Sequence, residues 1–571
     1  MSFELAYQKW LENEHLETAL SRQLEEMTEA EKEDAFYKSL EFGTAGMRGL
    51  MGPGTNRMNI YTIRKANVGF AQYLLNHVEQ AKSRGVAIAY DSRHFSLEFA
   101  LESAKVLATQ GIKTYLFEGV RPTPELSFAV RHLGCAGGIV ITASHNPPEY
   151  NGYKIYDESG CQTLPGEGDK VIAGVHAVDD VFAIEVKSES VLRADGLIVT
   201  IGSEIDDAYL ACVKGLEINP DLDKSGLKIV FSPLHGTAGM LTTELMRSCG
   251  YEGFQVVAEQ AEPDGRFITV DYPNPEDAAA FEYAIRLGEK MDADLLLATD
   301  PDADRMGVAA KGLNGQYVLL TGNQTGAVLT YYILSQRQAK GTLPEKGRLF
   351  DTIVSSELAA KIARSYGLET ISTLTGFKFI GEQIRLMEGS ASTYVFGYEE
   401  SYGSLIGDFV RDKDAIQAVL ILSEAAAYYQ AQGKTLCDVL DDIYCEFGYY
   451  EEDLVNISLA GKEGSEKIQL LLSEFRQTPP QWVAGLKVVV IEDYQTSERI
   501  EGATTSTIDL PAADVLKYIL EDGSWFVLRP SGTEPKAKIY ISVVTDDQQQ
   551  TAARVEHIKR DVLTKVDLIL K

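Results

Sequence analysis

The stretch GIVITASHNPP, residues 138–148, joins an uncharged strand directly to a turn of small and polar side chains. Its first part, residues 138–142, is short and rich in β-branched residues, which is typical of a buried strand. Its second part is a turn that Pro147 and Pro148 stiffen, with Ser144 near its start. In open α/β folds, ligands gather at the carboxyl ends of the strands. The stretch therefore predicts an α/β fold with a site at the edge of a sheet.

Similar apolar runs recur along the chain and alternate with stretches of helical periodicity, such as residues 97–110. This alternation is typical of βαβ units and predicts largely parallel or mixed sheets. The pattern restarts twice, so we expect three similar α/β domains in series. The predicted strands are residues 85–90, 113–117, 138–142, 228–231, 254–257, 295–299, 352–354 and 393–396.

The opening segment, up to about Lys38, differs from this pattern. Leu16, Leu20, Leu24 and Met27 recur at helical spacing among Glu, Lys and Ala residues. Apolar residues at this spacing predict an amphipathic helix. We expect this helix to pack outside the first α/β domain.

The last part of the chain changes pattern again near Tyr449. Strands at residues 525–529 and 537–543, followed by a final helix, predict a smaller α+β domain. The fold class is therefore α/β, with four domains in a row around a central cleft, and clefts between domains are frequent binding sites. The expected domains are residues 1–205, 206–313, 314–445 and 446–571.

The 571-residue chain is strongly acidic, with 53 Lys and Arg against 84 Asp and Glu and a net charge of −31. Such a charge repels nucleic acid and anionic membrane surfaces, so neither is an expected partner. Hydrophobic content of 45% and charged content of 24% are typical of folded globular proteins. The longest apolar runs, such as residues 418–422, fall far short of the roughly 20 residues that cross a bilayer.

We expect a cytoplasmic location. The N-terminus lacks the basic start and apolar run of a secretion signal. The cysteines are dispersed without a Cys-x-x-Cys pair, which argues against a zinc site and against a disulfide framework. The six are Cys135, Cys161, Cys212, Cys249, Cys437 and Cys445.

A second candidate site follows the predicted strand at residues 295–299. Asp300, Asp302 and Asp304 alternate there, and carboxylates that lie close together demand a cation. With only oxygen ligands nearby, the expected cation is Mg²⁺ rather than Zn²⁺. A calcium loop of the EF-hand type is excluded, because its sixth and twelfth positions would be Arg and Lys. The alternative is a solvated acidic turn.

Ser144 is the candidate nucleophile, although a serine in such a turn often makes only local hydrogen bonds. No Gly-x-Ser-x-Gly elbow of the hydrolase type surrounds it. Magnesium prefers a few carboxylates plus a phosphate oxygen, so a phosphate on Ser144 would complete the aspartate site. The ion would neutralise the phosphoryl group during its transfer. The two motifs thus explain each other.

Four further loops carry groups suited to a phosphorylated sugar. Residues 529–535, RPSGTEP, offer an arginine fork and hydroxyls to a phosphate, but lack the spacing of a nucleotide P-loop. Residues 397–403, GYEESYG, offer carboxylates and hydroxyls to sugar hydroxyls. Residues 375–378, TGFK, offer an amine for proton transfer or phosphate binding, and residues 42–49 place an arginine in a glycine-rich turn. Each loop alone could be an ordinary turn.

Taken together and in this order, these segments resemble those of the α-D-phosphohexomutase family, most closely its glucose-phosphate members. The likeness covers nearly the whole chain, with a loop in each of the four domains. It implies an enzyme that interconverts glucose 1-phosphate and glucose 6-phosphate through a phosphoserine at Ser144. Glucose 1,6-bisphosphate is the implied intermediate and activator. The implied cofactor is Mg²⁺, held by that phosphate on Ser144 and by Asp300, Asp302 and Asp304.

The resemblance also implies roles for individual residues. Lys154 and Lys378 are candidates for proton transfer, and Arg48 and Arg305 are candidates to lie beside the reacting phosphoryl group. His145, next to the serine, is a further candidate catalytic residue. The residues implied to bind substrate are Thr44, Glu399, Ser401, Arg529, Ser531, Gly532 and Thr533.

The sequence leaves alternatives open for the substrate and for the class of function. Tyr398 and Tyr402 flank the Glu-Glu-Ser core where relatives carry Gly, Phe or His, so a mannose- or pentose-phosphate mutase or a bisphosphate synthase is the main alternative. A phosphatase would not need groups for both ends of its substrate. A non-catalytic sugar-phosphate-binding protein would be expected to lose Ser144 or an aspartate, and neither is lost. The expected partner is a small-molecule hexose phosphate, and the sequence does not indicate an oligomeric state.

Overall fold

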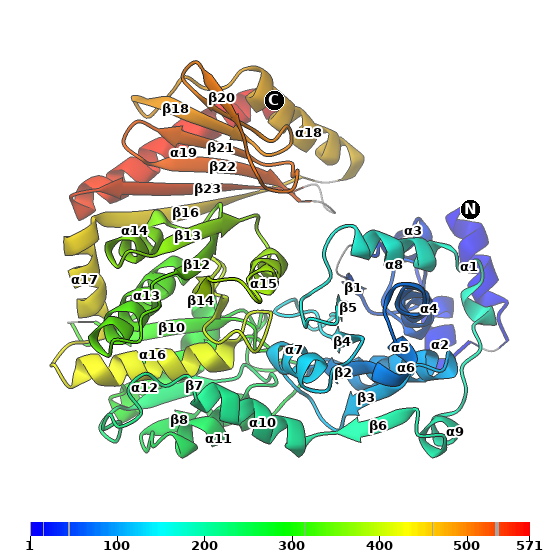
Figure 1. The fold of residues 1–571 in the computed structure, drawn as a ribbon. Coiled ribbons are helices and arrows are strands. Elements are labelled where there is room, and N and C mark those ends of the chain that lie inside the picture. The colour runs from blue at the N-terminus through cyan, green and yellow to red at the C-terminus, as the bar shows by residue number, and fades with distance from the viewer. Residues whose placement is uncertain (1, 15, 44–45, 313, 460, 532–535) are drawn as a thin grey trace.

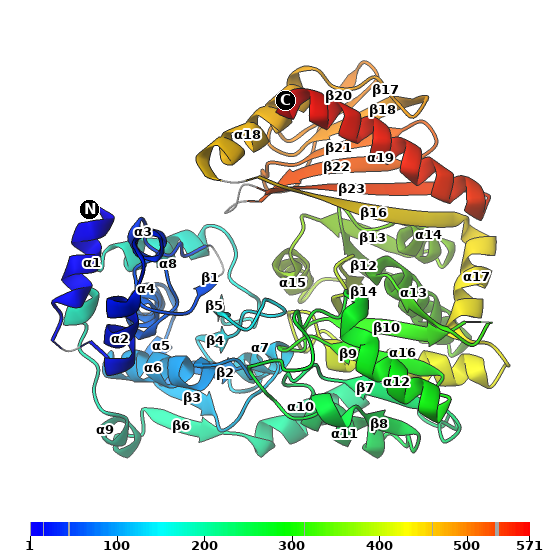
Figure 2. The same ribbon diagram turned by 180° about the vertical axis from the view of Figure 1, so that it is seen from behind.

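Four sheets follow one another along the chain, each flanked by its own helices (Figure 1). The structure is a computed structural model that describes residues 2–14, 16–43, 46–312, 314–459, 461–531 and 536–571. Its first three sheets form α/β domains and the fourth an α+β domain, which confirms the predicted fold class. The first domain lies beside the second and third, and the fourth lies against the third (Figure 1, Figure 2).

The sheet of the first domain is mixed, with strand order β1-β5-β4-β2-β3-β6. Strands β4, β2, β3 and β6 are parallel, whereas β5 runs antiparallel to both of its neighbours. The strands are β1 (Gly46–Leu50), β2 (Val86–Tyr90), β3 (Thr114–Phe117), β4 (Gly137–Ile141), β5 (Tyr150–Tyr156) and β6 (Ile198–Ile201). The helices are α1 (Phe3–Leu11), α2 (Thr18–Glu26), α3 (Glu29–Phe36), α4 (Ile60–His77), α5 (Ala81–Arg84), α6 (Ser96–Thr109), α7 (Thr123–His132), α8 (Glu167–His176) and α9 (Glu189–Ala194).

The second and third domains repeat this layout with smaller sheets, of orders β11-β10-β9-β7-β8 and β13-β12-β14-β15. The second contains β7 (Ile229–Ser232), β8 (Phe254–Val256), β9 (Leu295–Thr299), β10 (Met306–Lys311), β11 (Tyr317–Leu320), α10 (Ser203–Lys214), α11 (Gly239–Ser248) and α12 (Glu282–Met291). The third contains β12 (Gly347–Thr352), β13 (Glu369–Thr373), β14 (Thr393–Tyr398), β15 (Ser404–Leu405), α13 (Gly322–Ala339), α14 (Glu357–Ser365), α15 (Phe377–Leu386), α16 (Ala415–Gln430) and α17 (Leu436–Phe447).

The fourth domain is an antiparallel sheet of order β16-β23-β22-β21-β18-β19-β20, with β17 paired to β18. Two long helices cover one face of this sheet (Figure 2). The elements are β16 (Tyr449–Ser458), β17 (Trp482–Val483), β18 (Leu486–Asp493), β19 (Glu498–Glu501), β20 (Thr504–Thr507), β21 (Leu516–Leu520), β22 (Trp525–Pro530), β23 (Lys536–Thr545), α18 (Gly461–Gln477) and α19 (Gln548–Leu570).

One continuous apolar core joins the first three domains. It includes α16, which is buried on nearly every side because it is hydrophobic all round. The fourth domain has a core of its own and meets the third domain through a separate apolar cluster. At that junction Lys517 Nζ donates a hydrogen bond to Ile353 O at 2.8 Å. The site is therefore framed by three domains with a shared core and by a fourth that docks on one side.

Two predicted elements need correction. The strand predicted at residues 352–354 lies earlier in the chain: β12 spans Gly347–Thr352, and Ile353 and Val354 instead pack against the fourth domain. Their β-branched side chains serve an interface between domains, which has the same sequence pattern as a short buried strand. The single N-terminal helix is instead three short helices, α1, α2 and α3.

The N-terminal helices pack on the chain's own first domain. Trp10 is 3% exposed and makes edge-to-face contacts with the rings of Phe36, Tyr61 and Phe182. Leu16, Leu20 and Met27, predicted to share a helical face, pack against the same cluster. This cluster is separate from the main core of the domain.

Trp10→Ala tests the independence of this N-terminal cluster. Removing a buried tryptophan is expected to cost about 3–5 kcal/mol of stability. We expect this loss of stability to affect the N-terminal helices alone. The catalytic rate should not change, because the cluster contains no predicted site residue. Hydrogen exchange of residues 3–36 together with a turnover assay checks both parts, and a loss of turnover in the folded variant would contradict this separation.

No helix in the described part of the chain is both long enough and apolar enough to cross a membrane. All six cysteines are free thiols, as predicted, and Cys135, Cys161 and Cys249 are buried. Burial raises the pKa of the Cys135 and Cys161 thiols to about 12. These two therefore carry no thiolate near neutral pH. The cytoplasmic location stays a prediction of the sequence.

Candidate functional site

Ser144 lies in the turn between β4 and β5, at the carboxyl end of the parallel part of the first sheet. Its backbone N–H donates to Thr142 Oγ1 at 2.8 Å. Its φ of +52° lies in the left-handed region, which residues other than glycine adopt at a cost in free energy. The residue is 6% exposed, and its hydroxyl points toward the second domain.

The three aspartates lie in the turn that follows β9 of the second domain. Asp300 and Asp302 are fully buried and Asp304 nearly so. Asp300 Oδ1 accepts hydrogen bonds from the backbone N–H groups of Asp304 and Arg305, both at 3.1 Å. One carboxylate oxygen from each of the three lies within 4.8 Å of the others. A solvated acidic turn is therefore the wrong description of this loop.

The two loops meet directly, although 156 residues separate them. Ser144 Oγ donates a hydrogen bond to Asp300 Oδ2 at 2.7 Å. The contact joins the first domain to the second, since each loop ends a strand of its own sheet. The structure thus brings together the serine and the aspartates that the sequence linked only through their chemistry.

The aspartate cluster fits a hard divalent cation. Asp302 Oδ1 and Asp304 Oδ1 are buried and accept no hydrogen bond within the described residues. Buried carboxylate oxygens without partners are costly, and a cation between them would remove that cost. The donor set is oxygen alone, which suits Mg²⁺.

The pKa values of the cluster reflect crowding of like charges. Burial raises the pKa of Asp300 well above its usual range, and the charges of Asp302 and Asp304 raise it further. Burial also acts to raise the pKa of Asp302, but the Lys154 ammonium beside it holds that pKa well below its usual range. Without a cation, the cluster can therefore share a proton. A divalent cation would replace that proton.

Lys154, on β5, reaches the same cluster. Its Nζ lies 2.8 Å from Asp302 Oδ2 and 3.8 Å from Asp304 Oδ2. Burial acts to lower the pKa of Lys154, but these two carboxylates more than offset it and leave the pKa raised. Lys154 is therefore an ammonium, able to donate a proton or to balance negative charge.

Arg48 and Arg305 flank the serine from two sides. Arg48, on β1, pairs with Gly152 across the sheet, and its Nη1 donates to Asn146 Oδ1 at 2.9 Å. Arg305 Nη1 donates to Glu276 Oε1 at 2.7 Å, and its Nε lies 3.7 Å from Asp304 Oδ1. Both predicted arginines are thus placed near the serine and the aspartates.

His145 follows the serine and lies next to its hydroxyl. Its Nδ1 is 3.1 Å from Ser144 Oγ, and its ring stands edge-on against Tyr272 at 5.6 Å. Burial, together with the charge of Arg305, lowers the pKa of His145 to about 2. The imidazole is therefore neutral across the physiological range.

The sugar-loop candidates lie in the third domain, in the turn after β14. Glu399 is 6% exposed, and its Oε1 accepts a hydrogen bond from Gly376 N at 2.8 Å. This bond joins Glu399 to the residue before α15, the helix that carries Lys378. Ser401, half-buried, lies in the same turn as Glu399. Met306 N donates to Tyr402 O at 3.0 Å, so this loop is also tied to the start of β10 in the second domain.

The fourth domain contributes Arg529 at the end of β22. Its Nη1 lies 3.5 Å from the Tyr540 hydroxyl, and Ser531 N donates to Lys536 O at 2.8 Å. Burial lowers the pKa of Lys378, and the positive charge of Arg529 lowers it further. Lys378 is therefore within the electrostatic influence of Arg529. The predicted residues Thr44, Gly532 and Thr533 lie outside the described residues.

Several residues around the site were missed by the sequence reasoning. Glu276 pairs with Arg305, and Thr123 Oγ1 donates to Asp302 Oδ2 at 2.9 Å. Lys413 Nζ lies 3.0 Å from Asp304 Oδ2. Glu276 ends the run PNPE, residues 273–276, and Thr123 lies between Pro122 and Pro124. Prolines mark both positions as turns, but a turn alone does not indicate a site.

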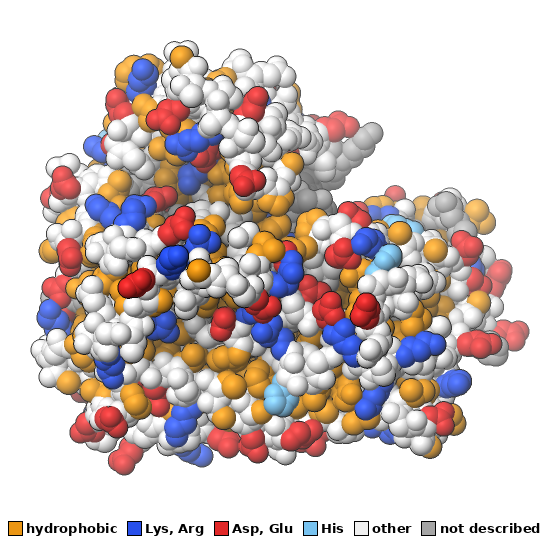
Figure 3. All heavy atoms as spheres, in the orientation of Figure 1, with side chains coloured by type: hydrophobic (Ala, Val, Ile, Leu, Met, Phe, Trp, Pro, Cys, Tyr) orange, Lys and Arg blue, Asp and Glu red, His pale blue; other side chains and the backbone are white. Residues whose placement is uncertain are grey.

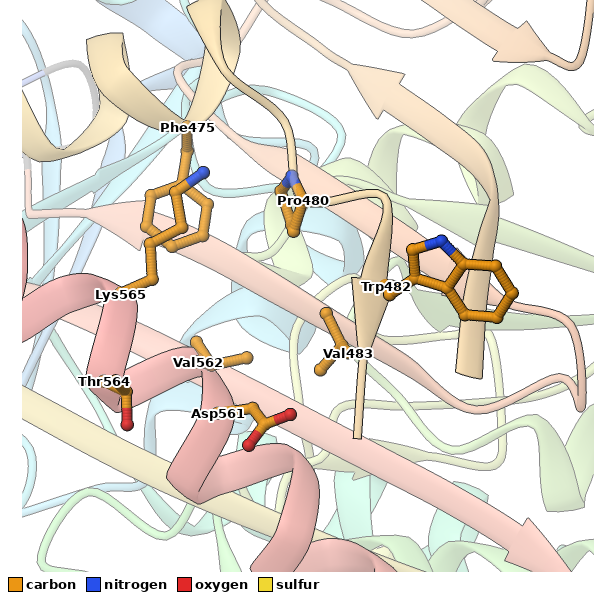
Figure 4. A pocket seen from close by; sticks show the side chains of 8 residues that line it. All are labelled: Phe475, Pro480, Trp482, Val483, Asp561, Val562, Thr564 and Lys565. Atoms are coloured by element: carbon orange, nitrogen blue, oxygen red, sulfur yellow. The ribbon is translucent and has the colours of Figure 1, made fainter. Parts of the chain in front are cut away.

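The molecular surface is indented between the first and fourth domains (Figure 3). A separate open pocket of about 220 Å³ lies in the fourth domain, between the end of α18, β17 and α19 (Figure 4). Phe475, Trp482 and Lys565 are among its lining residues. This pocket contains none of the predicted site residues.

Comparison with known proteins gives matches over all four domains. Three match families described as phosphoglucomutase/phosphomannomutase, alpha/beta/alpha domains I, II and III, over residues 39–181, 207–314 and 321–447. The fourth matches the phosphoglucomutase/phosphomannomutase C-terminal domain over residues 486–559.

Individual relatives agree with these matches. A phosphoglucomutase of Staphylococcus aureus (strain MRSA252) is 40% identical over 534 residues, which cover 93% of this chain and 94% of that one. The crystal structure of parafusin, a phosphoglucomutase of Paramecium, in its open form has a TM-score of 0.65 at 20% identity, covering 93% and 96% of the two chains. A phosphoglucomutase/phosphomannomutase family protein of Burkholderia thailandensis has the same TM-score at 19% identity, covering 92% and 97%. The two structures show a shared fold.

Proposed function

The chain belongs to the phosphoglucomutase/phosphomannomutase family, and from this membership we propose that it is a phosphoglucomutase. It would interconvert glucose 1-phosphate and glucose 6-phosphate through a phosphoserine and a glucose 1,6-bisphosphate intermediate. The observation that carries the proposal is the 2.7 Å contact between Ser144 Oγ and Asp300 Oδ2, which places a candidate phosphate carrier on a carboxylate cluster.

We propose that Asp300, Asp302 and Asp304 hold Mg²⁺, together with an oxygen of the phosphate on Ser144. Support comes from the buried oxygens of Asp302 and Asp304 that accept no hydrogen bond within the described residues, and from the all-oxygen donor set. When bound, the ion supplies positive charge that stabilises the phosphoryl group during transfer.

The proposed reaction moves one phosphoryl group in each half. A sugar hydroxyl oxygen attacks the phosphorus on Ser144, the bond from phosphorus to Ser144 Oγ breaks, and the hydroxyl proton ends on that serine oxygen. The bisphosphate then turns end for end, and Ser144 Oγ takes back the other phosphoryl group with the proton moving in reverse. Holding both partners in one geometry provides much of the rate gain.

The chain's own residues have separate proposed tasks around Ser144. Lys154, an ammonium beside the aspartates, is the better placed of the two lysines to relay the proton. Arg48 and Arg305 are proposed to balance the charge of the transferring group. His145 is neutral and lies 3.1 Å from the serine oxygen. Its Nδ1 would accept a hydrogen bond from Ser144 Oγ, or donate one to it, as the phosphoryl group leaves.

The far end of the substrate would be held by the third and fourth domains. Glu399 and Ser401 are proposed to bind sugar hydroxyls, and Arg529 and Ser531, with Gly532 and Thr533, the phosphate that is not in transfer. Lys378 stays a candidate for proton transfer or phosphate binding, since burial and the positive charge of Arg529 lower its pKa and ease the loss of its proton. Thr44 stays a predicted substrate contact.

Arg529→Ala tests the phosphate role. Loss of a charge-assisted hydrogen bond to phosphate costs about 1.5–3 kcal/mol, so KM for glucose 1-phosphate is expected to rise roughly 10- to 100-fold. We expect little change in the melting temperature, since the Arg529 side chain is partly exposed and its hydrogen bond to Tyr540 is 3.5 Å long. Steady-state kinetics check this, and an unchanged KM would remove Arg529 from the phosphate site.

The proposed activity is tested by coupled turnover of glucose 1-phosphate to glucose 6-phosphate, with Mg²⁺ and a trace of glucose 1,6-bisphosphate. Mannose 1-phosphate and ribose 1-phosphate are measured beside it, because the matching families are described for both glucose and mannose mutases. Fast conversion of glucose 1-phosphate that a chelator abolishes supports the proposal. Conversion of another sugar alone would correct the substrate, and no conversion of any would favour a binding protein.

A further inference from the structure

Arg93, directly after β2, lies at the centre of the Ser144 turn, although the proposed reaction gives it no task. Its side chain is completely buried. Nη2 donates to Ser144 O at 2.6 Å and also to Asn146 O. Nη1 donates to Pro147 O at 2.8 Å and to Tyr150 O at 3.1 Å. One guanidinium thus binds four backbone carbonyl oxygens of the segment that carries the serine.

Arg93 also forms an ion pair with Asp91. Its Nε lies 3.3 Å from Asp91 Oδ2, without the geometry of a hydrogen bond. The other carboxylate oxygen, Asp91 Oδ1, accepts hydrogen bonds from Ser96 Oγ at 2.7 Å and from Arg93 N at 2.9 Å. A guanidinium has five N–H groups in a fixed plane, whereas a lysine has three on one nitrogen. Lysine therefore could not reproduce this set of contacts.

The bound segment needs such support. Ser144 has a φ of +52°, and a strained residue keeps its conformation only where its surroundings hold it. Arg93 binds the carbonyl group of that same residue. The serine hydroxyl, on the same residue, lies 2.7 Å from Asp300 Oδ2. Arg93 therefore holds the backbone of the residue that carries this hydroxyl.

The second domain closes over Arg93. The ring centroid of Phe267 lies 5.0 Å from the guanidinium carbon. Two residues earlier, Gly265 lies so close to the first domain that a Cβ there would be 2.6 Å from His94 N and 2.7 Å from Ser92 O. The turn that holds Arg93 thus lies between residues 144–150 and the second domain, which carries the aspartates.

We propose that Arg93 is a positioning residue for phosphoryl transfer, holding the Ser144 turn in register with Asp300, with Phe267 seating it from the second domain. The inference rests on the proposed function, since it assigns Arg93 a task in that reaction. Arg93 acts through backbone carbonyl groups and does not touch the reacting atoms.

Arg93→Lys is the main test, with Arg84→Lys as the matched control. Arg84, at the end of α5, donates to Gly134 O at 2.9 Å and Cys135 O at 2.8 Å. It is a second carbonyl-binding arginine, whose acceptors lie before β4 instead of after it. A displacement of about 1 Å at a reacting group can cost about 100-fold in rate, and we expect that loss of kcat in Arg93→Lys. KM for glucose 1-phosphate should change little, and Arg84→Lys should keep the wild-type kcat.

Chemical rescue separates positioning from general loss of structure. In Arg93→Ala, added guanidinium at concentrations well below those that unfold the protein is expected to restore part of kcat, whereas methylammonium is not, because it lacks the planar set of donors. If neither cation restores kcat in a folded variant, or if Arg93→Lys keeps kcat within a few-fold of wild type, the inference is overturned.

Hydrogen exchange gives a readout that does not depend on turnover. Backbone amides of residues 143–151 should exchange faster in Arg93→Lys than in wild type, and at the wild-type rate in Arg84→Lys. Equal exchange of this segment in all three proteins would overturn the inference. Absence of turnover in the wild type itself would instead count against the proposed function, while the exchange comparison still decides the role of Arg93.

Discussion

Ser144→Ala is expected to lower kcat by about 10⁴-fold or more, because removal of a covalent nucleophile removes the reaction path itself. The folded state should survive. The variant loses one hydrogen bond, from Oγ to Asp300 Oδ2, and a buried acceptor left with one partner fewer costs about 1–3 kcal/mol. The measurement is kcat with saturating Mg²⁺ and glucose 1,6-bisphosphate, beside a thermal melt.

The matched control for this prediction is Ser83→Ala, an exposed serine of the same domain whose hydroxyl bonds only to Gln80 O among the described residues. It should keep wild-type kcat. A folded Ser144→Ala protein with more than a small fraction of wild-type turnover would show that the phosphoryl group is carried elsewhere.

Asp302→Asn is expected to weaken Mg²⁺ binding and to remove most activity. The change keeps the shape of the side chain but removes one charge from the cluster, next to the Lys154 ammonium at 2.8 Å. Loss of charge stabilisation by several kcal/mol corresponds to about 10³-fold in kcat. The Mg²⁺ affinity should fall at least about 10-fold, measured by calorimetric titration without substrate.

Asp221→Asn, at an exposed aspartate of the second domain, is the control for charge alone. It should leave both the titration and kcat unchanged. If Asp302→Asn binds Mg²⁺ as tightly as wild type, the metal lies at another site and the proposed ligand set is wrong.

The contact between Ser144 and Asp300 could be predicted from the residue types in the two loops and from their positions after strands. Ser144 and Asp300 each come directly after a buried strand, and Mg²⁺ prefers carboxylates with a phosphate oxygen, so the two loops were expected to meet. The structure places them 2.7 Å apart. The order of the domains was likewise visible, because βαβ alternation and its change near Tyr449 are local patterns.

Other features have no local pattern to reveal them. Arg93 binds backbone carbonyl groups, and because every residue has one, the sequence gives no signal of this contact. Lys413 reaches Asp304 from the segment before α16, a contact set by the packing of the third domain on the second. Ile353 and Val354 resemble a strand because an interface between domains buries the same residue types. The domain boundaries and the residue roles stay predictions.

The most direct test of the central claim is a single-turnover transfer from the enzyme itself. The protein is phosphorylated with glucose 1,6-bisphosphate, freed of sugar, and mixed with glucose 1-phosphate and Mg²⁺, and the peptide that contains Ser144 is followed by mass spectrometry. The account predicts that this peptide carries the phosphate and, when the glucose 1,6-bisphosphate that loaded it is isotope-labelled, exchanges the labelled phosphate for the unlabelled one of glucose 1-phosphate within one turnover. The label leaves on the sugar, with no inorganic phosphate released. Phosphate on another residue, or its release to water instead of to the sugar, would contradict the account.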